Sequence, residues 1–412
     1  MDITRRTMLA TGLAGIAMMP ARLTQAQARD TIRIGVITDM SGVYSDVSGP
    51  TTVACAQQAA MEFMSENPGI KVEILVADHQ NKPDVGLGII RRWFDIGGID
   101  VIENVGNSAI VLGSRGLLEE KDKASIITTA ASSNITGKDC SAHWVHWSHD
   151  SWGTTHSTAV STVKTGGRKW FFLTADYAYG HAAEADTGRF VTQAGGKVLG
   201  SVRFPLGATG DFSSYLLRAQ SSGADVLGII GGGSDLINIV KQASEFGLGA
   251  SGMKLAVLSG YITEILGMGL PEAKGLLLTE SFYWDLNERT RSFMTRLKPR
   301  VPNGVFPNMS QAGDYAGVMH YLKAVKAIGV PAAKASGRKT IETMKAMPTD
   351  DDCFGAGRIR QDGRKIHPNY LFTVKSPDES RYPGDVFKLT STVPAEEAFR
   401  PLNDGGCALV KA

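Results

Sequence analysis

The chain has almost no net charge. Its 412 residues include 43 Lys and Arg against 41 Asp and Glu. Three of these basic residues and one acidic residue lie in residues 1–28, so the rest of the chain is neutral. Proteins that bind nucleic acid carry a basic footprint, and no block of like charge occurs here. We therefore exclude nucleic acid as a partner.

Catalytic motifs are also scarce. GxSxG, HExxH and CxxC do not occur. An SxxK match at 161–164 lies late in an expected amphipathic helix and lacks the companion motifs of serine acylases. The acidic run at 349–353 lacks the spacing of a calcium loop. We expect no enzymatic activity, no cofactor and no metal.

Four of the eight histidines nevertheless lie close together, and they invite a metal-site interpretation. They are His143, His146, His149 and His156. The stretch "HWVHWSHD" has the composition of a strand, whose side chains alternate between faces, so that His146 would point away from its two neighbours. Structural or interlobe histidines explain the cluster more simply than a metal site.

Long apolar runs are absent after residue 28, so no segment there is long enough to cross a bilayer. The N-terminus has Arg5 and Arg6, an uncharged stretch over 7–21, and a small-x-small cleavage signal at 26–28. This order predicts a signal peptide over 1–28, of the twin-arginine type that exports folded proteins. An amphipathic helix is the alternative. We expect the mature protein in the periplasm.

Cysteine is scarce, with four residues in all, and each lies after the predicted signal. They are Cys55, Cys140, Cys353 and Cys407. An oxidising compartment permits one or two disulfides. Four cysteines allow three full pairings, and the spacing does not choose among them.

Strand-like and helix-like segments do fill the chain, in regular alternation. Strands are expected at 31–39, 70–78, 100–106, 124–130, 169–176, 197–204, 224–230, 254–259, 275–287 and 385–393, and helices at 51–65, 83–95, 108–121, 179–194, 212–222, 235–246, 288–297, 309–328 and 339–347. This alternation predicts an α/β fold with parallel sheets covered by helices on both faces. Towards the C-terminus, Asp362-Gly363 is a hairpin signal and indicates antiparallel strands.

The number of βα units is too large for one lobe. The repeat breaks at 140–153 and changes again after Leu276. We expect lobe 1 at 29–147 and 280–353, and lobe 2 at 148–279 and 354–412. Several short crossings between two lobes form a hinge.

The loops that follow the expected strands share one character. They are rich in Ser, Thr, Gly, Ala and Tyr and poor in charge. Ser108 and Ser132 place hydroxyls near helix N-termini, which favour anions such as carboxylates. Tyr44, Tyr179 and Tyr261 supply flat walls with polar tips. Generic α/β turns are the alternative for any single loop, but ligands in such folds gather at the carboxyl ends of strands.

An ordered series of segments resembles the branched-chain amino-acid-binding-protein family, the type I periplasmic solute-binding receptors of ABC transporters. The series comprises "IRIGVITDMSGVYSDVSGP", "TTAASSNITG", "KWFFLTADYAYGH", "GDFSSYLLRAQSSGADVLGIIGGGSDLINIVKQASEFGL" and "FGAGRIRQDGRKIHPNYLFTV". The resemblance covers the chain from about Ile32 to its end. It implies two Rossmann-like lobes, a three-crossover hinge, a ligand enclosed between the lobes, an ABC permease as partner and no enzymatic activity.

The resemblance also assigns site residues. The family's carboxylate donors fall on Ser108 and on the Ala131-Ser132 step, while loop aromatics fall on Tyr44 and Tyr179. Gly260 and Tyr261 stand where amino-acid receptors hold an acidic residue for the ammonium group. Gly233 or Ser234 stands where they hold a second aromatic. We therefore expect a small organic carboxylate, aromatic or aliphatic, rather than an amino acid. The expected ligand-binding residues are Tyr44, Ser108, Ala131, Ser132, Trp152, Tyr179, Ser234 and Tyr261.

The sequence thus predicts a monomeric periplasmic binding protein that passes its ligand to an ABC permease. A ligand-sensing receptor domain of the same fold is one alternative. A periplasmic hydrolase is another, although no nucleophile–base pair is visible. Because Cys140 precedes the first crossing and Cys407 lies in a tail expected near the crossings, we predict that these two form a disulfide.

Overall fold

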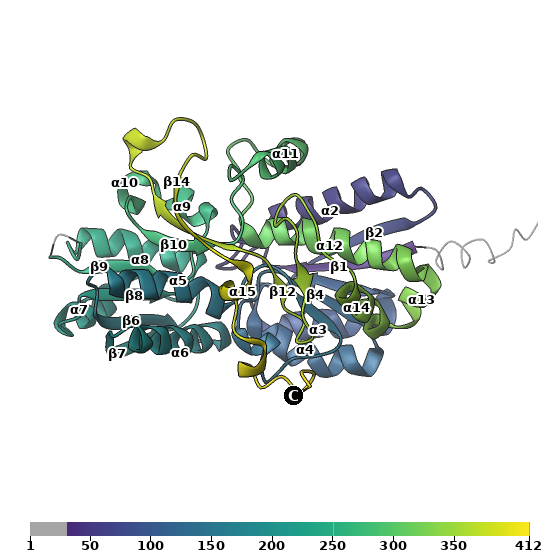
Figure 1. Ribbon diagram of the computed structural model, residues 1–412, viewed down its shortest axis with the longest axis horizontal. Coiled ribbons are helices and arrows are strands. Elements are labelled where there is room, and N and C mark those ends of the chain that lie inside the picture. Colours follow the sequence, from purple (N-terminus) through teal and green to yellow (C-terminus); the bar gives the residue numbers. More distant parts are fainter. Residues whose placement is uncertain (1–30, 250, 412) are drawn as a thin grey trace, which may run out of the picture.

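The computed structural model describes residues 31–249 and 251–411, which form two α/β lobes side by side along the long axis (Figure 1). The sheet of lobe 1 is parallel, in the order β2-β1-β3-β4-β5. Its strands are β1 (Thr31–Thr38), β2 (Lys71–Asp78), β3 (Val101–Asn104), β4 (Ala124–Ile127) and β5 (Trp144–His146). Two Rossmann-like lobes are the expected fold class, and this prediction is confirmed.

Lobe 1 forms because β1 carries apolar side chains on both faces. Ile32, Ile34 and Val36 face one hydrophobic core, while Ile37 faces the other. The first core is covered by α2 (Gly49–Glu66), α11 (Glu288–Leu297), α12 (Met309–Ile328), α13 (Val330–Ala335) and α14 (Gly337–Ala346). The second is covered by α3 (Pro83–Arg92), the π-helical turn Trp93–Gly97 and α4 (Ser108–Lys121).

Lobe 2 has a seven-stranded sheet in the order β14-β13-β10-β9-β8-β6-β7. Its strands are β6 (Lys169–Ala175), β7 (Lys197–Phe204), β8 (Val226–Ile230), β9 (Lys254–Val257), β10 (Leu277–Glu280), β13 (Asn369–Val374) and β14 (Phe387–Val393). Only β13 runs against the others, and it pairs antiparallel with both β10 and β14. One face is covered by α5 (Ser151–Lys164) and α6 (Ala178–Gln193). The other is covered by α7 (Ser213–Ser221), α8 (Gly233–Glu245), α9 (Ile262–Met268) and α10 (Leu270–Ala273).

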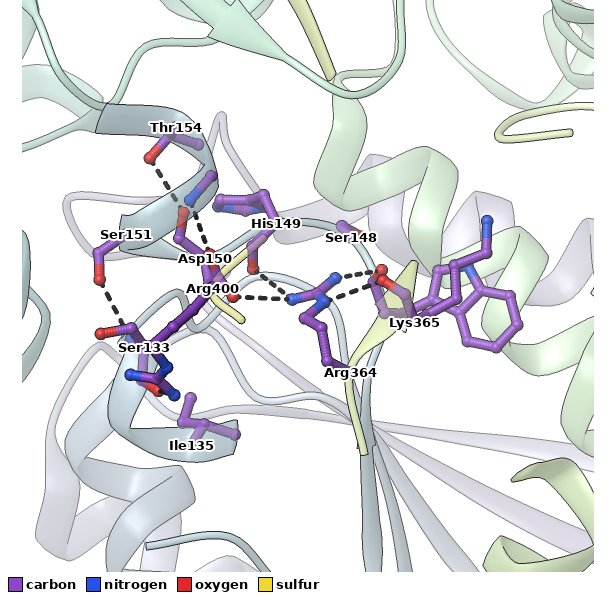
Figure 2. A network of polar contacts seen from close by, with 12 residues as sticks. Ser133, Ile135, Ser148, His149, Asp150, Ser151, Thr154, Arg364, Lys365 and Arg400 are labelled. Carbon is purple, nitrogen blue, oxygen red and sulfur yellow. Dashed lines mark hydrogen bonds and ion pairs between the residues drawn. The ribbon is translucent and has the colours of Figure 1, made fainter. Parts of the chain in front are cut away.

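A buried arginine joins two of the crossings between the lobes. The first crossing runs from β5 to α5, and the third follows the hairpin of β11 (Arg358–Ile359) and β12 (Lys365–Ile366). Arg364 precedes β12 and donates to the carbonyl oxygens of Trp147 and His149 in the first crossing (Figure 2). Its guanidinium also lies 3.7 Å from the carboxylate of Asp150, which caps the N-terminus of α5. The two crossings therefore share one buried ion pair.

The C-terminal segments are divided between the lobes differently from the proposed boundaries. A bridge between His146 and Arg364 attaches the β11–β12 hairpin to the edge of lobe 1, so the third crossing lies after Ile366 rather than at 353/354. The chain then enters lobe 2 through β13 and β14. After α15 (Ala395–Ala398) it returns to lobe 1, where a disulfide joins Cys407 to Cys140, the expected pairing. The remaining cysteines are buried free thiols.

The stretch that contains the clustered histidines is where the observed secondary structure differs most from the prediction. Only Trp144–His146 forms a strand, because the chain leaves the sheet at Trp147 to begin the first crossing. Short 3-10 turns complete the chain at Ser133–Thr136, Lys298–Arg300, Pro377–Glu379 and Leu402–Asp404. Among the described residues, no helix combines the length and apolar character needed to cross a membrane. The predicted signal at 1–28 lies outside the described residues.

Candidate functional site

A narrow cavity with about 20 Å³ of free volume lies between the two lobes, at the carboxyl ends of strands from both sheets. Its walls come from loops after β1, β3 and β4 in lobe 1 and after β6 and β9 in lobe 2. The lining residues are Tyr44, Val47, Gly106, Ser108, Thr129, Ala130, Ala131, Tyr177, Tyr179, Ser259 and Tyr261. That volume holds about one water molecule, so the wall or the lobes must move apart to admit a larger ligand.

Four tyrosines form the aromatic part of the wall. The hydroxyls of Tyr44 in lobe 1 and Tyr177 in lobe 2 lie 2.6 Å apart, and the ring of Tyr177 lies 5.8 Å from that of Tyr179. Burial raises the pKa of all four phenols, including Tyr261, above its ordinary value. At neutral pH each is therefore an uncharged hydrogen-bonding group beside an apolar ring.

The hydroxyls of Ser108 and Thr129 are directed by donors outside the cavity. Ser108 begins α4, and its Oγ accepts from the backbone N–H of Ser132 at 3.2 Å. The Oγ1 of Thr129 accepts from the side-chain amide of Asn104 at 2.8 Å. A hydroxyl has one proton to donate. Each hydroxyl oxygen already accepts a hydrogen bond from a group outside the cavity, so the hydroxyl protons of Ser108 and Thr129 remain available to a ligand.

Tyr261 is held by a histidine of the first crossing. Its hydroxyl lies 2.8 Å from His149 Nε2, and both side chains are buried. Burial and Arg364 lower the pKa of His149 to about 3, so its ring is neutral. His149 Nδ1 has no partner among the described residues. An orphaned buried N–H is rarer than an orphaned acceptor, so we assign the ring proton to Nε2, which leaves the Tyr261 proton free to point into the cavity.

A buried carboxyl group supports this wall from behind. Glu264 on α9 accepts from the backbone N–H of Tyr261 at 2.8 Å and from that of Gly233 at the start of α8. Burial raises the pKa of Glu264 to about 8, although the two N–H donors act in the opposite direction. Glu264 does not line the cavity, so its role is to hold the two loops together.

No Asp, Glu, Lys or Arg occurs among the described residues that line the cavity. An ammonium group enclosed there would have no carboxylate partner, and burying an unpaired charge is costly. A carboxylate would instead meet hydroxyl donors from Ser108, Thr129 and Tyr261. Hydrogen bonds to an ionised acceptor are roughly twice as strong as neutral ones, so the cavity favours an acceptor group over a cation.

Most of the expected ligand-binding residues lie at the cavity. The structure places Tyr44, Ser108, Ala131, Tyr179 and Tyr261 in its lining. Tyr179 is notable because its hydroxyl is buried and makes no hydrogen bond among the described residues. Burial raises its pKa, and the nearby Ser259 and Thr154 offset part of that rise. An unpaired hydroxyl at the wall is a further group available to a ligand.

Three expected residues do not line the cavity. Ser132 caps the 3-10 turn Ser133–Thr136 by accepting from Asn134 N, so it acts through its backbone N–H rather than its hydroxyl. Trp152 packs edge-on against Phe190 behind the cavity wall. Ser234 donates its backbone N–H to the carbonyl of Val43 across the interlobe boundary. Ser132 and Trp152 therefore support the cavity wall, whereas Ser234 supports the closed arrangement of the lobes.

Sequence reasoning missed several lining residues, namely Val47, Gly106, Thr129, Ala130, Tyr177 and Ser259. Tyr177 lies in the same loop as the expected Tyr179, and the two residues are separated only by Ala178. Its position as the N-cap residue of α6 turns its ring towards Tyr44. The loop composition signalled all six, but the signal did not rank the residues within a loop.

Three of the four clustered histidines contact other side chains of the fold, whereas both ring nitrogens of the buried His146 have no hydrogen-bond partner among the described residues. His143 lies 3.2 Å from Asp122, His149 bonds Tyr261, and His156 packs against Phe190. Within 31–249 and 251–411, no group of three or more His, Cys, Asp or Glu residues is arranged to hold a metal ion. The interlobe interpretation therefore fits His149 best.

Comparison with known proteins identifies the family to which this fold belongs. The family model described as periplasmic binding protein matches residues 31–380. A periplasmic binding protein from Burkholderia mallei is 40% identical, with a TM-score of 0.87, covering 93% of this chain and 100% of the other. A branched chain amino acid ABC transporter periplasmic ligand-binding protein from Burkholderia xenovorans LB400 is 36% identical, with a TM-score of 0.78 and coverages of 92% and 99%.

A third solved structure shares the fold at lower identity. It is an ABC transporter solute binding protein from R. palustris in complex with 4-hydroxybenzoate, 23% identical, with a TM-score of 0.79 and coverages of 90% and 99%. The matched family consists of solute-binding proteins rather than enzymes. This chain belongs to the periplasmic binding protein family, as a type I substrate-binding protein of ABC transporters from the branched-chain amino-acid-binding group.

Proposed function

We propose that this substrate-binding protein captures a small organic carboxylate, aromatic or aliphatic, and presents it to an ABC permease. The observation that carries the proposal is that the hydroxyl groups of the cavity wall are arranged to donate hydrogen bonds to a ligand. Ser108, Thr129 and Tyr261 have acceptor positions occupied by framework groups and protons left to donate. Donors without a facing carboxylate suit an anionic acceptor and disfavour an ammonium group.

The aromatic wall supports the aromatic members of this ligand class. Tyr44, Tyr177, Tyr179 and Tyr261 surround a cavity with about 20 Å³ of free volume, so an aromatic ring would enter between them when the lobes move apart. Aromatic rings pack favourably against one another at centroid separations of roughly 4.5–7 Å. The likeness in fold to a protein solved with 4-hydroxybenzoate makes that acid a suitable first probe.

A thermal-shift series of matched ligands tests this proposal. We expect 4-hydroxybenzoate or an aliphatic acid such as hexanoate to raise the unfolding temperature, since a ligand that binds only the folded state at 100 times its Kd adds about 2.7 kcal/mol. Leucine, 4-hydroxyphenylglycine and 4-hydroxybenzamide should have little effect. A larger shift with leucine than with every acid would overturn the proposal.

We also propose export to the periplasm through the twin-arginine route. Arg5 and Arg6 lie outside the described residues, so this part rests on the sequence. Replacing both with Lys should leave precursor in the cytoplasm, as measured by fractionation. Unchanged export of that variant would show that another route is used.

A further inference from the structure

The backbone that leads into the cavity is in a rare conformation. Asn104 ends β3 with a φ of 74°, and Val105 follows with a φ of 51°. Left-handed conformations are uncommon outside glycine and unfavourable for a β-branched residue. Gly106 and Ser108, which line the cavity, come directly after this pair. Backbone strain of this kind gathers at ligand-holding loops, so Asn104 is a candidate for a role in the site.

A carboxyl group of α12 determines how the Asn104 amide is oriented. Asp314 accepts a hydrogen bond from the hydroxyl of Thr128, and its oxygens lie 3.1 and 3.2 Å from Asn104 Nδ2. An ionised carboxylate only accepts hydrogen bonds, so the amide nitrogen must face Asp314. Glu103 and Asp314 are both buried, and burial raises the pKa of each. The pKa of Glu103 is raised further, because Asp314 lies beside it. Glu103 therefore holds the proton of this carboxyl pair.

The same amide nitrogen reaches the cavity wall. Asn104 Nδ2 lies 2.8 Å from Thr129 Oγ1, which is its shortest hydrogen bond. An NH2 group has two protons to donate. Thr129 Oγ1 and an Asp314 oxygen are its nearest acceptors, whereas the hydroxyls of Thr52 and Thr128 lie further away, at 3.3 Å. Thr129 is thus an acceptor towards the framework and a donor towards the cavity.

We propose that Asn104 and Asp314 are positioning residues that make Thr129 a hydrogen-bond donor to the ligand carboxylate. Both are fully buried and neither lines the cavity, and Thr129 is the lining residue to which Asn104 donates. The inference rests on the proposed function, because it describes how Thr129 in the cavity wall favours a ligand with a carboxylate. This role gives a reason for the left-handed backbone of the buried Asn104, which precedes the loop that lines the cavity.

Exchanging the side chains of Asn104 and Asp314 replaces the donor beside Thr129 with an acceptor. The cluster still contains one amide and one carboxyl group at these two positions. In the double variant Asn104→Asp/Asp314→Asn, an acidic and an amide group still face each other. Asp also tolerates the left-handed conformation that Asn104 adopts. The group beside Thr129 now only accepts, so the Thr129 proton turns to the framework and a lone pair faces the cavity.

Affinities for 4-hydroxybenzoate and 4-hydroxybenzamide distinguish positioning from a merely structural role. Loss of a donor to a charged group should weaken acid binding by about tenfold to a hundredfold. The amide, whose NH2 donates to the exposed lone pair, should bind as well as or better than it does to wild type. Thr129→Val should weaken the acid to a similar extent. Thr340→Val, a control that removes a buried hydroxyl of α14 outside the cavity, should not.

An equal loss for acid and amide in the exchanged variant, or an unchanged acid affinity, would refute the positioning role. A ligand-free measurement covers the case in which that variant does not fold. In wild type labelled with 15N at asparagine, both amide protons of Asn104 should exchange slowly, and Thr129→Val should release one of them. Fast exchange of both protons in wild type would equally contradict the inference.

These outcomes separate the inference from the proposed function. Should wild type bind neither probe, or prefer the amide, the proposed function fails at the titration. The exchange of the Asn104 amide protons still reports whether that amide donates to Thr129. Slow exchange with one proton released by Thr129→Val would keep the positioning contact, whatever the ligand is.

Discussion

The hydrogen bond between Tyr44 and Tyr177 joins the lobes directly across the cavity. Tyr44 is buried, Tyr177 is half-buried, and their hydroxyl oxygens are 2.6 Å apart. Opening the lobes breaks this bond and lets both groups meet water. Tyr177→Phe leaves the Tyr44 hydroxyl without its partner only in the closed form, so the change acts on closure rather than on folding of either lobe.

The expected size follows from the cost of an unpaired buried hydroxyl, about 1–3 kcal/mol. Tyr177 is half-buried, so water can replace part of the lost bond, and the lower end applies. A cost of about 1–1.4 kcal/mol reduces the closed population, and with it the apparent affinity, by roughly five- to tenfold. Tyr370→Phe, at a half-buried tyrosine of β13 outside the cavity, is the matched control and should bind like wild type.

Calorimetric titration of 4-hydroxybenzoate into the two single variants and the double variant Tyr44→Phe/Tyr177→Phe measures the coupling. Removing both hydroxyls leaves no unpaired group, so the double variant should bind better than the product of the single losses predicts. Strictly additive losses would mean that each hydroxyl serves the ligand separately, and the interlobe contact would then have no role in closure.

Three further predictions concern the site and its scaffold. Ser108→Ala should weaken acid binding about tenfold to a hundredfold, whereas Ser132→Ala should weaken it less because its hydroxyl caps a turn; titration of both checks this. Burial raises the pKa of Glu264 to about 8 from an ordinary 4.5, so the folded protein keeps a proton that the unfolded chain releases. Stability from this group is thus present below pH 4.5 and lost as pH rises towards 8, and Glu264→Gln should flatten that decline in denaturant titrations. Cys140→Ser with Cys407→Ser should reduce the free energy of unfolding by about 2–5 kcal/mol, and an unchanged value would show that the tail is held by other contacts.

Much of the fold follows from hydrophobic periodicity. The helices predicted at 108–121, 288–297 and 309–328 have those same bounds in the structure. In each, a capping residue directly precedes the apolar repeat, namely Asn107, Asn287 and Asn308. Local chemistry of this kind is readable because cap and helix are adjacent in sequence. The attachment of β11–β12 to lobe 1 was not readable, since it depends on a pairing with His146 far along the chain.

The candidate site was predictable as a set of loops but not as a set of donors. Parallel strands bring their carboxyl ends to one edge, so loop composition alone pointed to the cavity. The direction of each hydroxyl depends on distant partners: Asn104 for Thr129, and His149 for Tyr261. Ser132 shows the limit most clearly. It lies in the expected loop, yet a local N–H of the following turn takes its hydroxyl.

The most direct test of the account is titration calorimetry of the wild-type protein with 4-hydroxybenzoate and 4-hydroxybenzamide, which differ in the carboxylate alone. A cavity whose hydroxyls donate should bind the acid at least about tenfold more tightly, the equivalent of one charged hydrogen bond of roughly 1.5 kcal/mol. Equal affinities, or tighter binding of the amide, would contradict the assignment of Ser108, Thr129 and Tyr261 as donors to a carboxylate.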